Sequence, residues 1–183
     1  MRSTGLLLCA ALVCATGQAA VEAPNQVKVT VEASVSFDRS SGLYSYAYEV
    51  YSAKASRQEV DQFSVRVPAS RIVNILAPRG WSGMSSTVID MVLWCACEED
   101  GITVPPGHVD DGQPLPSVFQ IKPGHRLGGF TFQSPDPPSR GVFYAGGFVR
   151  IPVEGVAFAP GKEPYQPDFP HNHFEGVTWT PRR

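Results

Sequence analysis

The sequence predicts an all-β protein: an antiparallel β-sandwich with an immunoglobulin-like or fibronectin-like topology, followed by an extended, proline-rich C-terminal tail. Three observations lead to this fold class. Segments with apolar residues at every second position recur between residues 27 and 151, clusters of Gly and Pro separate them, and no segment has the spacing of an amphipathic helix. This pattern is typical of a sandwich of roughly seven to nine strands, and the choice of topology rests on analogy between folds.

The central strand of the predicted sandwich is residues 43–52. An extended chain would place large apolar side chains on one face and mostly small or polar side chains on the other: Tyr44, Tyr46, Tyr48 and Val50 against Ser45, Ala47 and Glu49. Three tyrosines supply a large apolar area, and each hydroxyl needs a hydrogen-bond partner or water. We therefore expect the tyrosine face to lie in the core.

Strands on either side of this segment follow from the same alternation. Residues 27–38 alternate strictly, and the turn-forming residues 38–42 join them to the central strand, so the two strands should form a hairpin. The capping-box spacing at 56–59 leaves room for at most one helical turn before a strand at 62–67. A short apolar strand is expected at 72–76.

The second half of the predicted domain contains both a loop and further strands. Residues 82–86 are expected to form a loop, and residues 88–97 a strand that is apolar on both faces, as suits a strand covered on both sides. A long acidic loop rich in Gly and Pro follows. Strands are then expected at residues 118–121, 127–134 and 142–150.

The predicted tail, residues 152–183, shows no strand period. Six prolines are spread through it, yet it is more aromatic than a free linker: Phe158, Tyr165, Phe169, Phe174 and Trp179. A segment that lies extended on the body of the domain accounts for both facts. The sandwich itself is assigned to residues 27–151.

The N-terminus has the pattern of a signal peptide, residues 1–19. Arg2 precedes an apolar run at 6–13, and Gly17-Gln18-Ala19 suits signal peptidase, which predicts cleavage after Ala19. The apolar run is too short to span about 30 Å of hydrocarbon, and no longer run follows it. We expect a secreted or periplasmic protein without a membrane span.

Charge and motifs exclude several function classes. Cleavage removes one basic residue and leaves 14 basic against 17 acidic residues, with no basic patch for nucleic acid. The chain lacks the Gly-x-Ser-x-Gly motif and glycine-rich phosphate or dinucleotide loops. No cofactor is expected, and nothing in the sequence favours an enzyme.

Cys95 and Cys97 are the cysteines that remain after cleavage. In a regular strand their Cα atoms would lie about 6.6 Å apart with parallel side chains, which is near the upper limit for a disulfide. This geometry favours a pair of buried thiols over a disulfide. The disulfide stays open as an alternative if the strand bends, because an oxidising compartment would promote it.

Histidines and carboxylates in two loop regions offer an alternative function. A metal-dependent hydrolase could use His108, Asp110 and Asp111, together with His171 and His173 of the tail. No strict spacing ties these residues together, and Gly and Pro surround them. Solvated loop histidines are therefore the favoured interpretation, with no metal site.

Aromatic residues suggest binding as another possibility, although Trp81 could equally lie in the core and Trp179 could serve to pin the tail. Trp81 follows a turn and Trp179 lies near the C-terminus, and a Trp on a loop can stack on a sugar ring or anchor a protein partner. The resulting hypothesis is an exported, non-catalytic binding module for a carbohydrate or protein ligand. A second alternative is an envelope or surface assembly subunit joined by strand addition at an exposed sheet edge.

Overall fold

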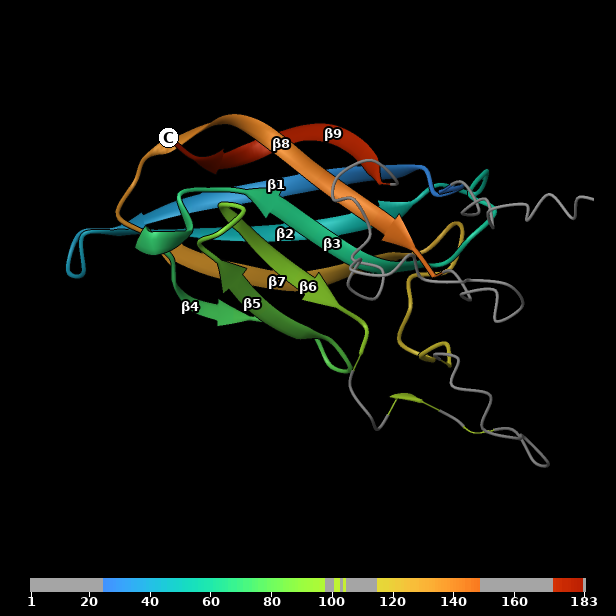
Figure 1. Cartoon of the computed structure of the whole chain (residues 1–183). Helices are drawn as coiled ribbons and strands as arrows, with labels where there is room; N and C mark the ends of the chain where they lie inside the picture. Colours follow the sequence, from blue (N-terminus) through green and yellow to red (C-terminus); the bar gives the residue numbers. More distant parts are fainter. Residues whose placement is uncertain (1–24, 98–100, 103, 105–114, 149–172, 183) are drawn as a thin grey trace, which may run out of the picture.

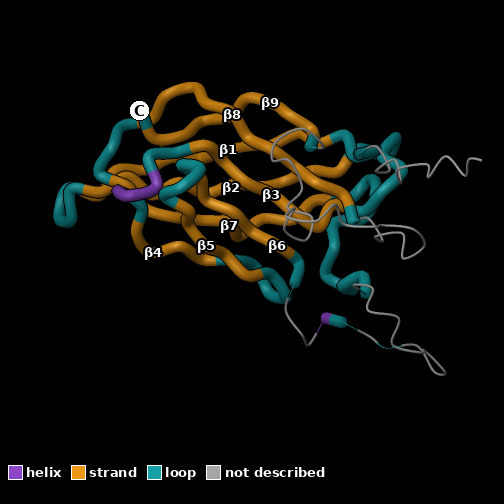
Figure 2. The backbone as a smooth tube through the Cα atoms, in the orientation of Figure 1, coloured by secondary structure: helices purple, strands orange, loops and turns teal. Residues whose placement is uncertain are grey.

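A computed structural model describes residues 25–97, 101, 102, 104, 115–148 and 173–182, and within these residues the protein is all-β (Figures 1 and 2). Two antiparallel sheets pack face to face. Sheet A has the strand order β1-β2-β7-β4, and sheet B the order β5-β6-β3-β8-β9. The elements are β1 (Val29–Asp38), β2 (Leu43–Ser52), β3 (Val60–Arg66), the 3₁₀ helix η1 (Ala69–Arg71), β4 (Val73–Leu76), β5 (Ser82–Ser86), β6 (Met91–Cys95), β7 (Arg126–Ser134), β8 (Pro138–Gly147) and β9 (Phe174–Pro181).

The predicted hairpin is confirmed, because β1 and β2 pair antiparallel from Val29↔Ser52 to Asp38↔Leu43. Its turn is organised by Asp38, whose carboxylate accepts hydrogen bonds from the backbone N–H and the hydroxyl of Ser40. These bonds lower the pKa of Asp38. Gly42 closes the turn at φ 71°, a left-handed conformation that glycine adopts without a Cβ clash.

The tyrosine face of β2 lies in the core, as predicted. Tyr46, Tyr48 and Val50 are buried, and both buried hydroxyls reach backbone carbonyls. Tyr46 donates to Asp136 O at 2.7 Å, and Tyr48 donates to Trp179 O at 3.0 Å. Burial raises the pKa of both phenols. Each tyrosine therefore combines a buried ring with a satisfied polar end.

Aromatic rings from both sheets meet in the middle of the sandwich. The Tyr48 ring lies 5.7 Å from Phe63 of β3, which stacks on Trp94 of β6 at 5.3 Å. Phe130 of β7 completes the contact, with its ring edge-to-face to Trp94 at 5.7 Å. Offset and edge-to-face pairs of this kind stabilise a core beyond the area that they bury.

The structure corrects three expectations about strands. Residues 82–86 form strand β5, not a loop, because their backbone pairs with β6 over Ser82↔Cys95 to Ser86↔Met91. The strand expected at 88–97 begins only at Met91, since residues 87–90 form a turn that exposes Val88 and Ile89. Residues 118–121 form no strand: Ile121 makes an isolated bridge with Val60, and Ser117, just before the segment, makes another with Ile102.

The end of the expected tail also differs from the sequence prediction. Phe174–Pro181 forms β9, which pairs antiparallel with β8 as the last strand of sheet B. The buried side chains in its C-terminal half include those of Thr178 and Thr180, so this strand does not show alternating apolar residues in its sequence.

Residues 152–172 and the expected signal peptide lie outside the described residues. The helical segment that the structure describes is too short and polar to cross a membrane.

Candidate functional site

Trp81 is not a surface binding residue, which corrects the sequence interpretation. Its side chain is 3% exposed, and its indole N–H donates to Phe119 O at 2.9 Å. The ring packs edge-to-face against Phe130 with centroids 5.0 Å apart. The turn before Trp81 therefore directs the side chain into the core, where it cannot stack on a ligand.

Trp179 is partly accessible on β9, with 43% of its surface exposed. The guanidinium of Arg140, its partner in the β8–β9 pairing, lies over the ring at 5.3 Å from the centroid. This cation–π contact covers part of the ring and fixes its orientation. Trp179 remains a candidate for contact with a ligand, although Arg140 already covers part of its ring.

Of the residues of the metal-hydrolase alternative, the structure describes His173. His173 lies beside Gln62, with Nε2 and Oε1 3.2 Å apart. His108, Asp110, Asp111 and His171 lie outside the described residues. Among the residues that are described, no three His, Cys, Asp or Glu side chains form a group that could hold a metal ion.

Cys95 and Cys97 form a disulfide in the structure, whereas the sequence interpretation favoured two thiols. Their Cα atoms are 5.3 Å apart, within the usual range for a disulfide. The longer separation expected from the sequence assumed a continuous strand, but β6 ends at Cys95 and the chain bends beyond it. The structure therefore contains the disulfide, which the sequence interpretation kept as the alternative to two thiols.

Asp61 is a half-buried residue with one buried carboxyl oxygen, and nothing in the sequence pattern identifies it. Its Oδ1 is buried and has no hydrogen-bond partner among the described residues, and burial raises its pKa to about 7. Its backbone carbonyl accepts from Ala96 N–H at 2.9 Å, so the residue lies at the end of the β3–β6 pairing. A carboxyl with a raised pKa links the stability of the fold to pH.

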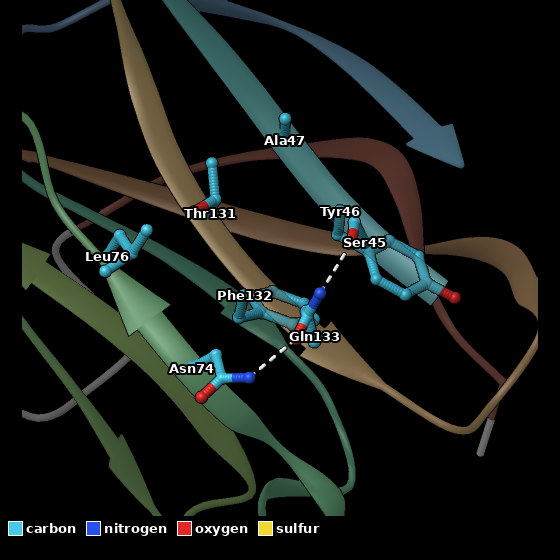
Figure 3. A pocket seen from close by; sticks show the side chains of 8 residues that line it. All are labelled: Ser45, Tyr46, Ala47, Asn74, Leu76, Thr131, Phe132 and Gln133. Carbon is cyan, nitrogen blue, oxygen red and sulfur yellow. Dashed lines mark hydrogen bonds between the residues drawn. The ribbon is translucent and has the colours of Figure 1, made fainter. Parts of the chain in front are cut away.

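A groove on the outer face of sheet A is the other feature that the sequence analysis missed (Figure 3). We call it the sheet A groove. It has a volume of about 380 Å³, and its lining comes from β2, β4 and β7: Ser45, Tyr46, Ala47, Asn74, Leu76, Thr131, Phe132 and Gln133. Small side chains at Ser45, Ala47 and Thr131 leave this face of the sheet open.

A chain of hydrogen bonds crosses the groove and connects its three strands (Figure 3). Asn74 Nδ2 donates to Gln133 Oε1 at 2.6 Å, and Gln133 Nε2 donates to Ser45 Oγ at 2.9 Å. We call these three residues the amide ladder. Each member holds the next in one orientation, so the polar groups are positioned before any ligand arrives.

The backbone at Asn74 explains how the ladder is built. Asn74 has φ 53°, a left-handed conformation that Asn tolerates better than most residues. The β4–β7 register shifts between Val73 and Leu76 at this point. The irregularity turns the Asn74 amide toward Gln133. In the sequence, the feature that could have indicated this irregularity is an Asn between the apolar residues Val73 and Ile75.

The chemistry of the groove suits binding. Its lining consists of amide, hydroxyl and apolar groups, with no carboxylate, imidazole, thiol or amine. The Tyr46 hydroxyl is turned away toward Asp136 O. Ser45 is hydrogen-bonded to an amide, which cannot act as a general base. The groove therefore offers neutral hydrogen-bonding groups beside the exposed side chain of Leu76.

Comparisons of this chain with protein-family models, with curated proteins and with solved structures found no match.

Proposed function

We propose that this protein is an exported, non-catalytic binding module whose sheet A groove takes a neutral carbohydrate. The observation that carries the proposal is the amide ladder, in which Asn74, Gln133 and Ser45 are held in fixed orientations on an open sheet face. Sugar hydroxyls both donate and accept hydrogen bonds, and amide and hydroxyl side chains match them in both roles. Leu76 supplies an apolar contact for the C–H face of a sugar ring.

The absence of charge from the groove lining favours a neutral ligand over an acidic or basic one. A charged ligand would have to give up water without gaining an opposite charge, which is costly. A neutral sugar exchanges its hydrogen bonds to water for hydrogen bonds to positioned amides at much lower cost.

Export is part of the same proposal. The basic, apolar and small-residue segments at 1–19 support it, and so does the Cys95–Cys97 disulfide, because disulfides persist in oxidising compartments. The N-terminal residue of protein recovered outside the cytoplasm tests it. We expect Ala20, whereas an intact Met1 would contradict processing.

We infer an immunoglobulin-like topology from the strand order. The order β1-β2-β7-β4 corresponds to A-B-E-D of a constant-type domain, and β3-β8-β9 corresponds to C-F-G. The hairpin β5–β6 is then an insertion between D and E that extends sheet B beyond strand C. This correspondence supports the finer topology, and the groove lies on the outer face of the A-B-E-D sheet.

A glycan array tests the carbohydrate proposal directly. We expect the mature wild-type protein to retain one or more neutral glycans and the Gln133→Ala variant to lose them, since the variant removes both hydrogen bonds of the ladder. Gln62→Ala is the matched control, because it deletes an exposed amide on sheet B. Equal retention by wild type and Gln133→Ala would contradict the proposal.

A further inference from the structure

The Cys95–Cys97 disulfide lies in sheet B, whereas the sheet A groove lies on the other sheet. Cys95 is the last residue of β6, and Cys97 follows it after Ala96. Cys97 is exposed and Cys95 is half-buried. A thiol that approaches from solvent therefore meets Cys97 first.

The strand that carries this disulfide is held by other interactions. Both cysteines lie at the end of the same strand, so the bond joins neither two strands nor the two sheets. β6 makes five backbone pairs with β3 and five with β5, and Trp94 anchors it in the core. In the chain-entropy model a disulfide stabilises more when it closes a longer loop, so a bond across a separation of two residues stabilises little. Stability therefore does not account for this bond.

The outer face of sheet B places Gln62 beside the disulfide. Phe63 of β3 pairs with Trp94 of β6, and both side chains are buried in the core. Successive side chains of a strand point to opposite faces, so the next pair, Gln62 and Cys95, faces outward. Directly paired residues have Cβ atoms about 4.5–5.5 Å apart, which brings the Gln62 side chain within reach of the Cys95 sulfur.

His173 orients the Gln62 amide from the other side. Gly146 of β8 pairs with Gln62, and a Cβ built on Gly146 would lie 3.0 Å from His173 Cδ2, so the imidazole lies against bare backbone. Its Nε2 is 3.2 Å from Gln62 Oε1. This contact uses the amide oxygen and leaves the amide N–H donors for another acceptor. Because β3 lies between β8 and β6, those donors are on the side of Cys95.

This arrangement suits Cys95 as the leaving sulfur in thiol–disulfide exchange. The sulfur leaves as a thiolate, and exchange is faster when that thiolate is more stable. A hydrogen bond from the Gln62 amide would stabilise the negative charge on Cys95 Sγ. Exposed disulfides are also reduced more readily than structural ones, and Cys97 is exposed.

We propose that the Cys95–Cys97 disulfide is a redox site that accepts two electrons from a dithiol. A substrate thiolate attacks Cys97 Sγ, the disulfide bond breaks, and its electron pair stays on Cys95 Sγ, which takes a proton from water. The second substrate thiol gives its proton to water and attacks the substrate sulfur of the mixed disulfide. Cys97 Sγ then leaves as a thiolate and is protonated. The substrate gains a disulfide, and Cys95 and Cys97 become thiols. One disulfide oxidises one dithiol, so the exchange is stoichiometric.

Reduction of the folded, mature protein by dithiothreitol tests whether the bond is open to attack. The new thiols are trapped with an alkylating agent and counted by intact mass. We expect the rate to rise in proportion to the dithiothreitol concentration, and the reduced protein to keep a melting temperature close to that of the oxidised protein. A rate that becomes independent of dithiothreitol would show that unfolding must come first and would overturn the proposal. A reduced protein that is unfolded would also overturn it.

A pair of single-cysteine variants tests which sulfur is attacked. Cys95→Ser keeps the exposed Cys97 thiol, and Cys97→Ser keeps the half-buried Cys95 thiol. With a chromogenic aromatic disulfide, folded Cys95→Ser should react at least about tenfold faster than folded Cys97→Ser. The two variants should react alike in urea. Equal rates in the folded proteins would overturn the assigned order of attack.

The role of Gln62 is tested by Gln62→Leu. This variant should slow reduction by dithiothreitol at least about threefold, because the leaving thiolate loses a hydrogen bond. In the Cys97→Ser background it should also move the pH profile of Cys95 alkylation to higher pH, which a purely structural role would not do. Arg66→Leu, exposed on the same strand, is the matched control and should change neither. Equal behaviour of the two variants would overturn the role of Gln62.

A synthetic peptide with two cysteines tests the electron transfer itself. After incubation of the reduced peptide with an equimolar amount of wild type, we expect the peptide to lose two hydrogen atoms and the protein to gain two, both measured by mass. Neither single-cysteine variant should oxidise the peptide, because neither contains the disulfide. A peptide that stays reduced in the presence of wild type would overturn the proposal.

Discussion

Replacing Asp61 with Asn should remove the contribution of this carboxyl to the pH dependence of folding between pH 4 and pH 8. In the native protein the buried carboxyl has no hydrogen-bond partner for Oδ1 among the described residues, and its pKa rises from 3.8 to about 7. The folded state therefore binds this proton more tightly than the unfolded state. The stabilisation is fully present below the unfolded pKa of 3.8 and is lost as the pH rises through about 7.

The magnitude follows from the same two pKa values. One pKa unit corresponds to about 1.4 kcal/mol, so a shift from 3.8 to about 7 costs about 4 kcal/mol of free energy of unfolding by pH 8. The amide introduced by Asp61→Asn cannot ionise, and the variant avoids this loss. Burying that amide costs about 1–3 kcal/mol at every pH, which shifts the whole curve without changing its slope.

Urea unfolding of wild type and Asp61→Asn at intervals from pH 4 to pH 8 measures the difference. We expect the stability of the variant relative to wild type to rise by several kcal/mol across this range. Asp38→Asn is the control, because Asp38 is an exposed carboxylate whose pKa is lowered by Ser40, so its contribution has the opposite sign. Parallel stability curves for wild type and Asp61→Asn would refute the argument.

Three further predictions concern stability and covalent structure. Tyr46→Ala should lower the free energy of unfolding by about 3–5 kcal/mol, and Tyr46→Phe by about 1 kcal/mol through loss of the bond to Asp136 O, both measured by urea unfolding; equal losses would contradict a buried ring. Reductant should increase the intact mass of the mature protein by two hydrogen atoms, and an unchanged mass would contradict the Cys95–Cys97 disulfide. Gly83→Ala should destabilise by about 1–3 kcal/mol, because its Cβ would meet Trp94, whereas an unchanged melting temperature would contradict that close approach.

The fold class was predictable because most core strands carry their own pattern. The alternation in residues 43–52 identified β2 with its observed bounds, Leu43–Ser52, and the face that it buries. β5 lacked such a pattern, since Ser82–Ser86 is held by backbone pairing with β6 and has few apolar side chains. β9 was missed because Thr178 and Thr180, and not apolar residues, occupy its buried positions. Backbone pairing and polar burial leave little trace in hydrophobic periodicity.

The candidate site was not predictable from spacing along the chain. Ser45, Asn74 and Gln133 are far apart in sequence and meet only because β2, β7 and β4 are neighbours in sheet A. Each is an ordinary polar residue of a half-buried strand when taken alone. The burial of Trp81 was not predictable for a related reason. A Trp after a turn can face either side, and the carbonyl that accepts its indole N–H, Phe119 O, is 38 residues away.

Carbohydrate binding in the sheet A groove can be tested by an NMR titration of ¹⁵N-labelled mature protein with a glycan retained on the array. We predict that chemical-shift changes concentrate at the groove strands, in particular at Ser45, Asn74, Thr131 and the side-chain amide of Gln133. The same titration of Gln133→Ala should show little change. Shifts confined to β9 around Trp179, or none at saturating glycan, would contradict the claim.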